Sequence, residues 1–200
     1  MKISMHRLLH DDGKPYRFIP SPNIGTTIKP EFLIIHYTEG ASAEAAITWL
    51  TNRTSYVSAH LVVGRDGSIT QLAPFNRMAW HAGPSSWKGR KGLASATIGI
   101  ELDNAGPMKR DKGVWKASFG RTYPDSEVIE AVHKFGTQKL GWHTFPEVQI
   151  QAVIEVSALL VAEYHLTDVL GHDDIAPKRK WDPGPAFAMD DFRSRVIGRR

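Results

Sequence analysis

The chain of 200 residues contains no cysteine. This absence excludes a disulfide framework and any metal site built on thiolates, so a metal would have to be held by His, Asp or Glu. Long apolar runs are also missing, and no stretch approaches the roughly 20 apolar residues of a membrane-spanning helix. The first 18 residues lack the apolar segment of a secretory signal, because Leu8 and Leu9 stand between His and Asp residues. We therefore expect a cytoplasmic protein with no membrane span.

A strong excess of one charge is missing too. The net charge is +4 and the isoelectric point is about 9.3, with basic residues gathered at 88–91 and 109–116. Such patches could attract a polyanion, either nucleic acid or an anionic cell wall. Acidic residues are interleaved with the basic ones, which is typical of an ordinary solvated surface. We therefore expect no nucleic-acid partner, and a basic face with exposed aromatics would be needed to reverse that expectation.

The 42% hydrophobic content fits one globular domain with a sizeable core. Residues 1–30 are polar and Pro-rich and read as an extended arm, whereas 105–125 read as an irregular excursion over the surface. Ser42 is a candidate N-cap, and Thr144 with Glu147 forms a capping-box pattern. Patterning predicts strands at 32–37, 58–64, 68–72, 97–103 and 169–170, and helices at 43–52, from 147 to about 165, and at 185–197. Strands that alternate with helices indicate an α/β fold with a mixed sheet.

The segment 171–184, G-H-D-D-I-A-P-K-R-K-W-D-P-G, holds His172, Lys180 and Asp182 in one loop broken by Pro and Gly. A neutral imidazole and a carboxylate are good zinc ligands, and a nearby lysine can stabilise an oxyanion. The alternative is a polar surface loop in which the His and Asp side chains hydrogen-bond locally.

Two further polar residues stand in apolar strands. Glu101 lies inside T-I-G-I-E-L-D, where burying a carboxylate is costly unless it is paired or functional. It shares a strand face with other polar or small residues, and that face is either solvent-exposed or a cleft. His36 lies near the end of the run F-L-I-I-H-Y, where a hydrogen-bonded core histidine is the alternative to a ligand.

Together these residues make a set with a chemical meaning. His36, His172 and Asp182 form a two-histidine, one-carboxylate set, which leaves one zinc coordination position open for water. Glu101 would then be a general base and Lys180 an electrophilic partner.

The sequence resembles the zinc-dependent N-acetylmuramoyl-L-alanine amidases, the group that shares its fold with peptidoglycan recognition proteins. The matching segments occur in the family's order and cover most of residues 32–197. They are L-I-I-H-Y-T (33–38), S-A-H-L-V-V-G-R-D-G-S-I-T-Q-L (58–72), A-W-H-A-G (79–83), I-G-I-E-L (98–102) and G-H-D-D-I-A-P-K-R-K-W-D-P-G-P-A-F (171–187). The last segment is the strongest, because it joins ligand, lysine and ligand at the family's spacing.

The resemblance implies a single α/β catalytic domain over residues 31–200, with a central mixed sheet flanked by helices and a Zn²⁺ ion in a groove. By resemblance, His36, His172 and Asp182 match the zinc ligands. Glu101 matches the acidic residue that activates water, and Lys180 matches the lysine that stabilises the tetrahedral intermediate.

Other residues in the matching segments have less defined roles. His60 and His81 are candidates for substrate contacts or for contacts behind the metal ligands, and a structural role is the alternative for both. Trp80 is a candidate wall of the groove, with core packing as the simpler account. Trp181 departs from the family, where a small residue is usual, and it could narrow one end of the groove.

The implied reaction is hydrolysis of the amide between N-acetylmuramic acid and L-alanine of the stem peptide, in peptidoglycan or muropeptides, by a monomer. A non-catalytic peptidoglycan-binding module is the alternative, although such relatives typically lack a ligand and this chain keeps all three. The resemblance extends to recycling amidases of the cytoplasm, antimicrobial phage endolysins released by lysis, and delivered effectors alike.

Overall fold

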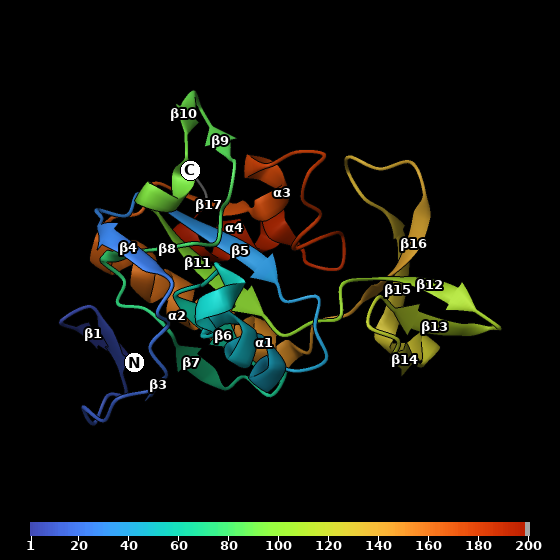
Figure 1. Cartoon of the computed structure of the whole chain (residues 1–200), viewed down its shortest axis with the longest axis horizontal. Helices are drawn as coiled ribbons and strands as arrows, with labels where there is room; N and C mark the ends of the chain where they lie inside the picture. The colour runs from blue at the N-terminus through green and yellow to red at the C-terminus, as the bar shows by residue number, and fades with distance from the viewer. Residues whose placement is uncertain (199–200) are drawn as a thin grey trace.

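The computed structural model describes residues 1–198, and Figure 1 shows how their helices and strands are arranged. Residues 199–200, which end the expected catalytic domain, lie outside this description. A six-stranded sheet runs through the centre in the order β17-β5-β11-β6-β7-β3. Its strands are β3 Arg17–Phe18, β5 Phe32–Tyr37, β6 Leu61–Val63, β7 Ile69–Gln71, β11 Thr97–Leu102 and β17 Asp168–Gly171.

Both directions of strand pairing occur in this sheet. β17, β5, β11 and β6 run parallel, β7 pairs antiparallel with β6, and β3 pairs parallel with β7. All six residues of β5 are buried, because a continuous apolar run suits a central parallel strand covered on both faces. The turn at 65–67 joins β6 to β7, with Gly67 at a φ of 82°. The expected α/β fold with a mixed sheet is confirmed.

Helices cover the two faces of this sheet unequally (Figure 1). α2 (Glu147–Tyr164) and α4 (Met189–Ile197) pack against one face and share its largest apolar cluster. α1 (Ala43–Leu50), the short α3 (His172–Ile175) and the 3₁₀ turn Leu93–Ala96 border the other face. Between these three elements the sheet stays uncovered near the carboxyl ends of β5 and β11, which leaves room for a groove.

The first thirty residues, expected as an extended arm, contain short strands that pair with the rest of the chain. β1 and β2 pair with each other, β3 joins the edge of the main sheet, and β4 pairs with β8. Another small hairpin is formed by β9 and β10. The bounds of these strands are β1 Lys2–Ser4, β2 Arg7–Leu9, β4 Ile24–Thr27, β8 Arg77–Ala79, β9 Ser86–Trp87 and β10 Arg90–Lys91.

The region expected as an irregular surface excursion, 105–125, is instead part of a second sheet. Five antiparallel strands in the order β14-β13-β12-β16-β15 form this clamp sheet, which stands beside the main sheet in Figure 1. It has an apolar cluster of its own around Met108, Trp115 and Tyr123. Its Gly, Lys and Pro residues lie in turns and on exposed strand faces. For this reason the alternation of apolar and polar residues that indicates a strand was not evident in the sequence. Its strands are β12 Pro107–Asp111, β13 Val114–Ala117, β14 Thr122–Tyr123, β15 Val128–Val132 and β16 Lys139–His143.

The helix ends follow the sequence in part. Ser42 caps α1 as predicted, because its side chain accepts a hydrogen bond from the backbone N–H of Ala45. The capping box predicted for α2 is wrong: Pro146 is the N-cap, and the Thr144 hydroxyl donates to the carbonyl of Glu127 instead. The last helix begins at Met189 rather than at 185. No helix within residues 1–198 is long and apolar enough to pass through a bilayer.

The packing of the clamp sheet gives a first prediction. Gly141 on β16 lies against the Trp115 ring, and a Cβ at this position would come within 2.6 Å of a ring carbon. We expect Gly141→Ala to lower the free energy of unfolding by about 1–3 kcal/mol through overpacking. Urea denaturation measures this change, with the exposed Val132→Ala on the neighbouring strand as a control. Equal stability of Gly141→Ala and the unmodified protein would contradict the packing described for this sheet.

Candidate metal centre and groove

Strand register brings the candidate residues together. β5 lies between β17 and β11, and its His36 is directly opposite Glu101 of β11. On the other side Gly171 of β17 pairs with Ile35, so the next residue, His172, arrives beside His36. All three residues therefore stand at the carboxyl ends of adjacent parallel strands, where open α/β sheets usually bind their ligands.

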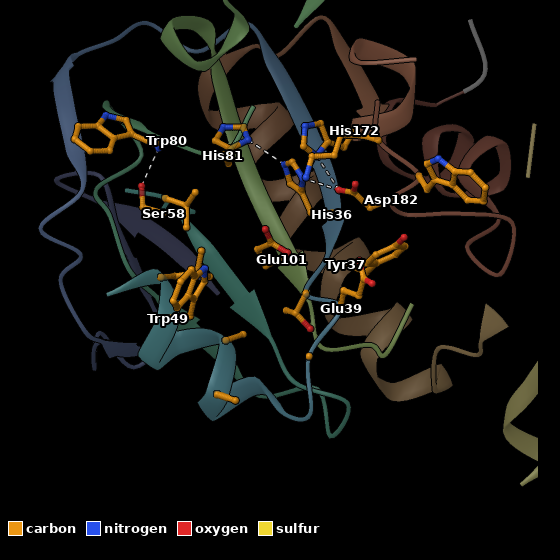
Figure 2. A pocket seen from close by; sticks show the side chains of 18 of the residues that line it. His36, Tyr37, Glu39, Trp49, Ser58, Trp80, His81, Glu101, His172 and Asp182 are labelled. Carbon is orange, nitrogen blue, oxygen red and sulfur yellow. Dashed lines mark hydrogen bonds and ion pairs between the residues drawn. The ribbon is translucent and has the colours of Figure 1, made fainter. Parts of the chain in front are cut away.

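His36, His172 and Asp182 converge on one point, as Figure 2 shows. The Nδ1 atoms of the two histidines are 2.9 Å apart, and each lies 2.9 Å from Oδ2 of Asp182. The three side chains are almost fully buried, at 1%, 3% and 6% exposure. This is the one group of three or more potential metal-ligating residues found within residues 1–198.

The hydrogen bonds on the outer side of these histidines determine which ring nitrogen carries the proton. Thr97 Oγ1 donates its proton to the Leu93 carbonyl and so accepts from Nε2–H of His81, 3.0 Å away. The ring nitrogen of His81 that can still accept a hydrogen bond is then Nδ1. It accepts one from Nε2–H of His36 at 2.9 Å. A hydrogen-bond chain therefore leaves Nδ1 of His36 with a lone pair that faces the point of convergence.

The second histidine is oriented in the same way. His172 Nε2 lies 3.2 Å from the carbonyl of Ala82, which can only accept, and 3.4 Å from the Arg179 guanidinium, which can only donate. The shorter contact favours a proton on Nε2. Two imidazole lone pairs and a carboxylate oxygen thus face one another in a buried space, where they would repel without a cation. This donor set fits a small divalent metal with nitrogen and oxygen ligands, and each ring nitrogen opposite the site has the partner expected behind a metal ligand.

The electrostatics of the site agree with neutral histidines. Burial, with the neighbouring His172 as a second cause, lowers the pKa of His36 to about 4. The pKa of His81 lies well below its ordinary value for the same first reason. At neutral pH His36 is therefore uncharged, which is the state in which an imidazole binds a metal.

Glu101 stands apart from the converging donors. Its side chain lines the groove, and its Oε2 atom is buried with no hydrogen-bond partner within residues 1–198. Burial and the charge of Asp182 raise the pKa of Glu101 well above its ordinary value, while Lys180 opposes the shift. A carboxyl group with a raised pKa beside the converging donors is suited to taking and returning a proton.

Lys180 and Arg179 approach the site from the loop that follows α3. Lys180 is among the residues that line the groove. Arg179, to which the sequence gave no role, donates to the carbonyls of Ala82 and Pro84 at 2.9 and 2.7 Å. Arg179 therefore holds this loop against the A-W-H-A-G segment. Nothing in the K-R-K run of the sequence indicated that Arg179 makes these contacts.

The groove around the point where the three donors converge has a volume of about 610 Å³. Its walls come from the end of β5, from α1, and from the two segments that carry Trp80 and Trp181. Trp49 of α1, which the sequence reading placed in no site, is 58% exposed and stands with Trp80 at one end (Figure 2). A groove of this size with tryptophan rings at its border can hold a ligand that has both apolar and polar parts.

His60 is not among the residues that line the groove. The residue is fully buried, accepts a hydrogen bond from the backbone N–H of Gly99 and donates to the carbonyl of Arg77. These contacts tie β11 to the segment at β8. His81, in contrast, lines the groove and touches His36 directly.

A sequence profile of the family described as N-acetylmuramoyl-L-alanine amidase matches residues 26–185. The chain belongs to this family. N-acetylmuramoyl-L-alanine amidase AmiD of Escherichia coli strain K12 is 34% identical over 175 residues, which are 83% of this chain and 53% of AmiD. The chain spans little more than half the length of the curated amidases it matches.

Solved amidase structures resemble the fold over nearly the whole chain. A crystal structure of a selenomethionine derivative of AmpD has a TM-score of 0.67 and 26% identity, covering 98% of this chain and 99% of that one. A complex of E. coli AmiD with the substrate anhydro-N-acetylmuramic acid-L-Ala-D-gamma-Glu-L-Lys has a TM-score of 0.64 and 32% identity. It covers 88% of this chain and 60% of that one. The fold expected for the family is therefore confirmed.

The environment of His60 leads to a prediction about pH. Burial lowers the pKa of His60 to about 4, whereas an unfolded histidine titrates near 6.5. Between these values the unfolded chain binds a proton that the folded chain excludes, so stability falls as pH drops from about 6.5 towards 4. His60→Gln removes this proton. Its stability deficit relative to the unmodified protein should shrink between about pH 7.5 and pH 5 in urea denaturation. A constant deficit would show that His60 does not titrate in this way.

Proposed function

We propose that the chain is a zinc-dependent amidase that hydrolyses the amide between N-acetylmuramic acid and L-alanine of the stem peptide. The observation that carries this proposal is the convergence of His36, His172 and Asp182, with lone pairs inward, at the floor of a groove that also contains Glu101. Membership of the amidase family and the muropeptide bound by AmiD support the choice of substrate. The same support extends to muropeptides and peptidoglycan as partners.

Each residue has a defined part in the proposed reaction. The three converging side chains would hold one Zn²⁺ ion, which supplies a Lewis acid that polarises the carbonyl and lowers the pKa of water. Glu101 takes the proton of the attacking water and returns it to the leaving amine, for which its raised pKa is suited. The Lys180 ammonium group neutralises the negative charge that develops on the carbonyl oxygen. His81 keeps the proton of His36 on the outer ring nitrogen.

We further propose that residues 31–200 are the catalytic domain, with the strands of 1–30 paired to it, and that it acts as a monomer in the cytoplasm. Release to the cell wall, as an antimicrobial endolysin or effector, is the alternative setting. A non-catalytic peptidoglycan-binding module is the competing function, since the groove alone suffices for binding. Mass spectrometry of a defined muropeptide after incubation separates the two. Release of a peptide that begins with L-alanine supports hydrolysis, and an unaltered muropeptide that stays bound supports the module.

The metal assignment predicts that the purified protein contains one zinc ion. Chelation should abolish hydrolysis and leave the protein folded, because the 200-residue core does not need the metal. His172→Ala should lose zinc in metal analysis, whereas His10→Ala, at an exposed histidine outside the groove, should keep it. Full zinc occupancy of His172→Ala would overturn the proposed ligand set.

The assignment of the general base predicts a separation of catalysis from metal binding. Glu101→Gln keeps the size of the side chain and removes the base, so kcat should fall about 10²–10⁴-fold with zinc retained. Lys180→Ala should lower kcat by about 10²–10³-fold, as expected for a lost oxyanion donor. Lys178→Ala, exposed on the same loop, is the matched control and should stay near the unmodified rate. If Glu101→Gln loses its zinc, the side chain is a ligand and the proposed mechanism is wrong.

A further inference from the structure

The clamp sheet touches the segment that carries two of the converging donors. This segment, residues 171–184, is called the metal loop below. The contact is made by the turn between β15 and β16, which lies beside α3 in Figure 1. His133 in this turn is buried, and its Nε2 lies 3.0 Å from Oδ2 of Asp173, the residue after His172. The pair is almost free of solvent, with side-chain exposures of 1% and 5%.

The direction of this hydrogen bond is defined by its surroundings. The backbone N–H of Phe135 donates to Nδ1 of His133, so Nε2 carries the proton and donates to Asp173. Lys134 adds an ion pair of 2.9 Å to the other carboxylate oxygen. The turn therefore holds Asp173 by a hydrogen bond from His133 to Oδ2, with the charge of Lys134 near Oδ1, which accepts no hydrogen bond within residues 1–198. Hydrogen bonds to a buried carboxylate are among the stronger ones in a protein.

Asp173 connects the clamp sheet to both of the proposed ligands in the metal loop, His172 and Asp182. It follows His172 in the chain, and its backbone N–H donates to the carbonyl of Asp182 at 2.9 Å. A single residue held by the clamp sheet thus fixes the spacing between the two ligands of the metal loop.

Aromatic stacking provides a second contact with the same loop. The His133 ring lies 5.0 Å from the Trp181 ring at an interplanar angle of 16°, and Trp142 of β16 stacks on both of them. Gly184 also packs directly on Trp142, because a Cβ there would come within 2.7 Å of the ring. Trp181, directly before Asp182, and Gly184, two residues after it, are therefore both packed against the clamp sheet. The bulky Trp181 therefore has two stacking partners here.

The metal loop needs such support because most of it has no regular structure. After the single turn of α3, the backbone of the metal loop from 176 to 184 lies in neither a helix nor a strand. A ligand on an unsupported loop must be ordered when the metal binds, and that ordering weakens the affinity. Partners behind the ligands that hold them in place raise metal affinity typically 10–100-fold.

We infer that the clamp sheet holds the metal loop in its metal-binding shape, with His133 as a positioning residue that acts through Asp173 and Trp181. The inference rests on the zinc site of the proposed function. It assigns to residues 107–143 a role in metal retention, although none of them reaches the metal-binding point.

The test compares zinc affinities by competition with a chromophoric chelator, using the full chain. His133→Phe keeps a ring for stacking and removes the donor to Asp173, so its zinc dissociation constant should rise about 10–100-fold. His133→Gln keeps an N–H that can reach Asp173 and should bind zinc more tightly than His133→Phe. Val132→Ala, on the adjacent exposed residue, should match the unmodified protein.

Thermal unfolding with the metal removed separates positioning from general stability. For a positioning role, the zinc affinity of His133→Phe falls by far more than any loss of stability of the metal-free protein explains. A metal-free His133→Phe that unfolds at a much lower temperature but binds zinc with unchanged affinity would overturn the inference. Failure of the unmodified protein to bind zinc would instead overturn the proposed function, so the two failures are distinguishable.

Discussion

The register of three parallel strands decides where the chemistry of this protein lies. β5 is paired on one side with β17 and on the other with β11, and no other pairing would bring His172 and Glu101 to the two sides of His36. Because side chains alternate along a strand, a slip of one residue in either pair would turn the functional residue into the apolar layer under α2 and α4. Burial of the apolar residues in that layer therefore sets the strand register, and with it the positions of the site residues.

This arrangement places polar side chains on a sheet that is otherwise apolar. The cost is limited because each buried histidine has a partner for its outer nitrogen: His36 has His81, and His172 has the Ala82 carbonyl. The ring of His81 reaches its place because Gly99 has no side chain, and a Cβ there would lie 2.5 Å from the ring. The inward lone pairs of the two histidine rings have no hydrogen-bond donor facing them in the described part of the chain, so only a cation can satisfy them. A site of this kind is stabilised by its ligand rather than by its own contacts.

Much of this architecture could be predicted from the sequence. Continuous apolar runs gave the strands that carry His36 and Glu101, and the broken loop at 171–184 gave a candidate pair of ligands. The predicted donors do converge, because parallel strands deliver their ends to one edge of the sheet. The five-stranded sheet was missed, since its strands are short and its exposed faces are rich in charge. The partners of His133 and Arg179 could not be predicted, because hydrogen bonds between residues 40 or more positions apart leave no local pattern.

The order of the main sheet also has a consequence for the newly synthesised protein. β17 is an edge strand, and in its absence the apolar β5 would itself be the edge (Figure 1). While the ribosome has not yet released residues 168–171, the nascent chain therefore exposes an unpaired, strongly apolar strand. Two of the three metal donors are still missing at that stage. The same late event closes the vulnerable edge and brings the last two converging donors into place, so a truncated chain would be prone to aggregate and would lack the complete donor set.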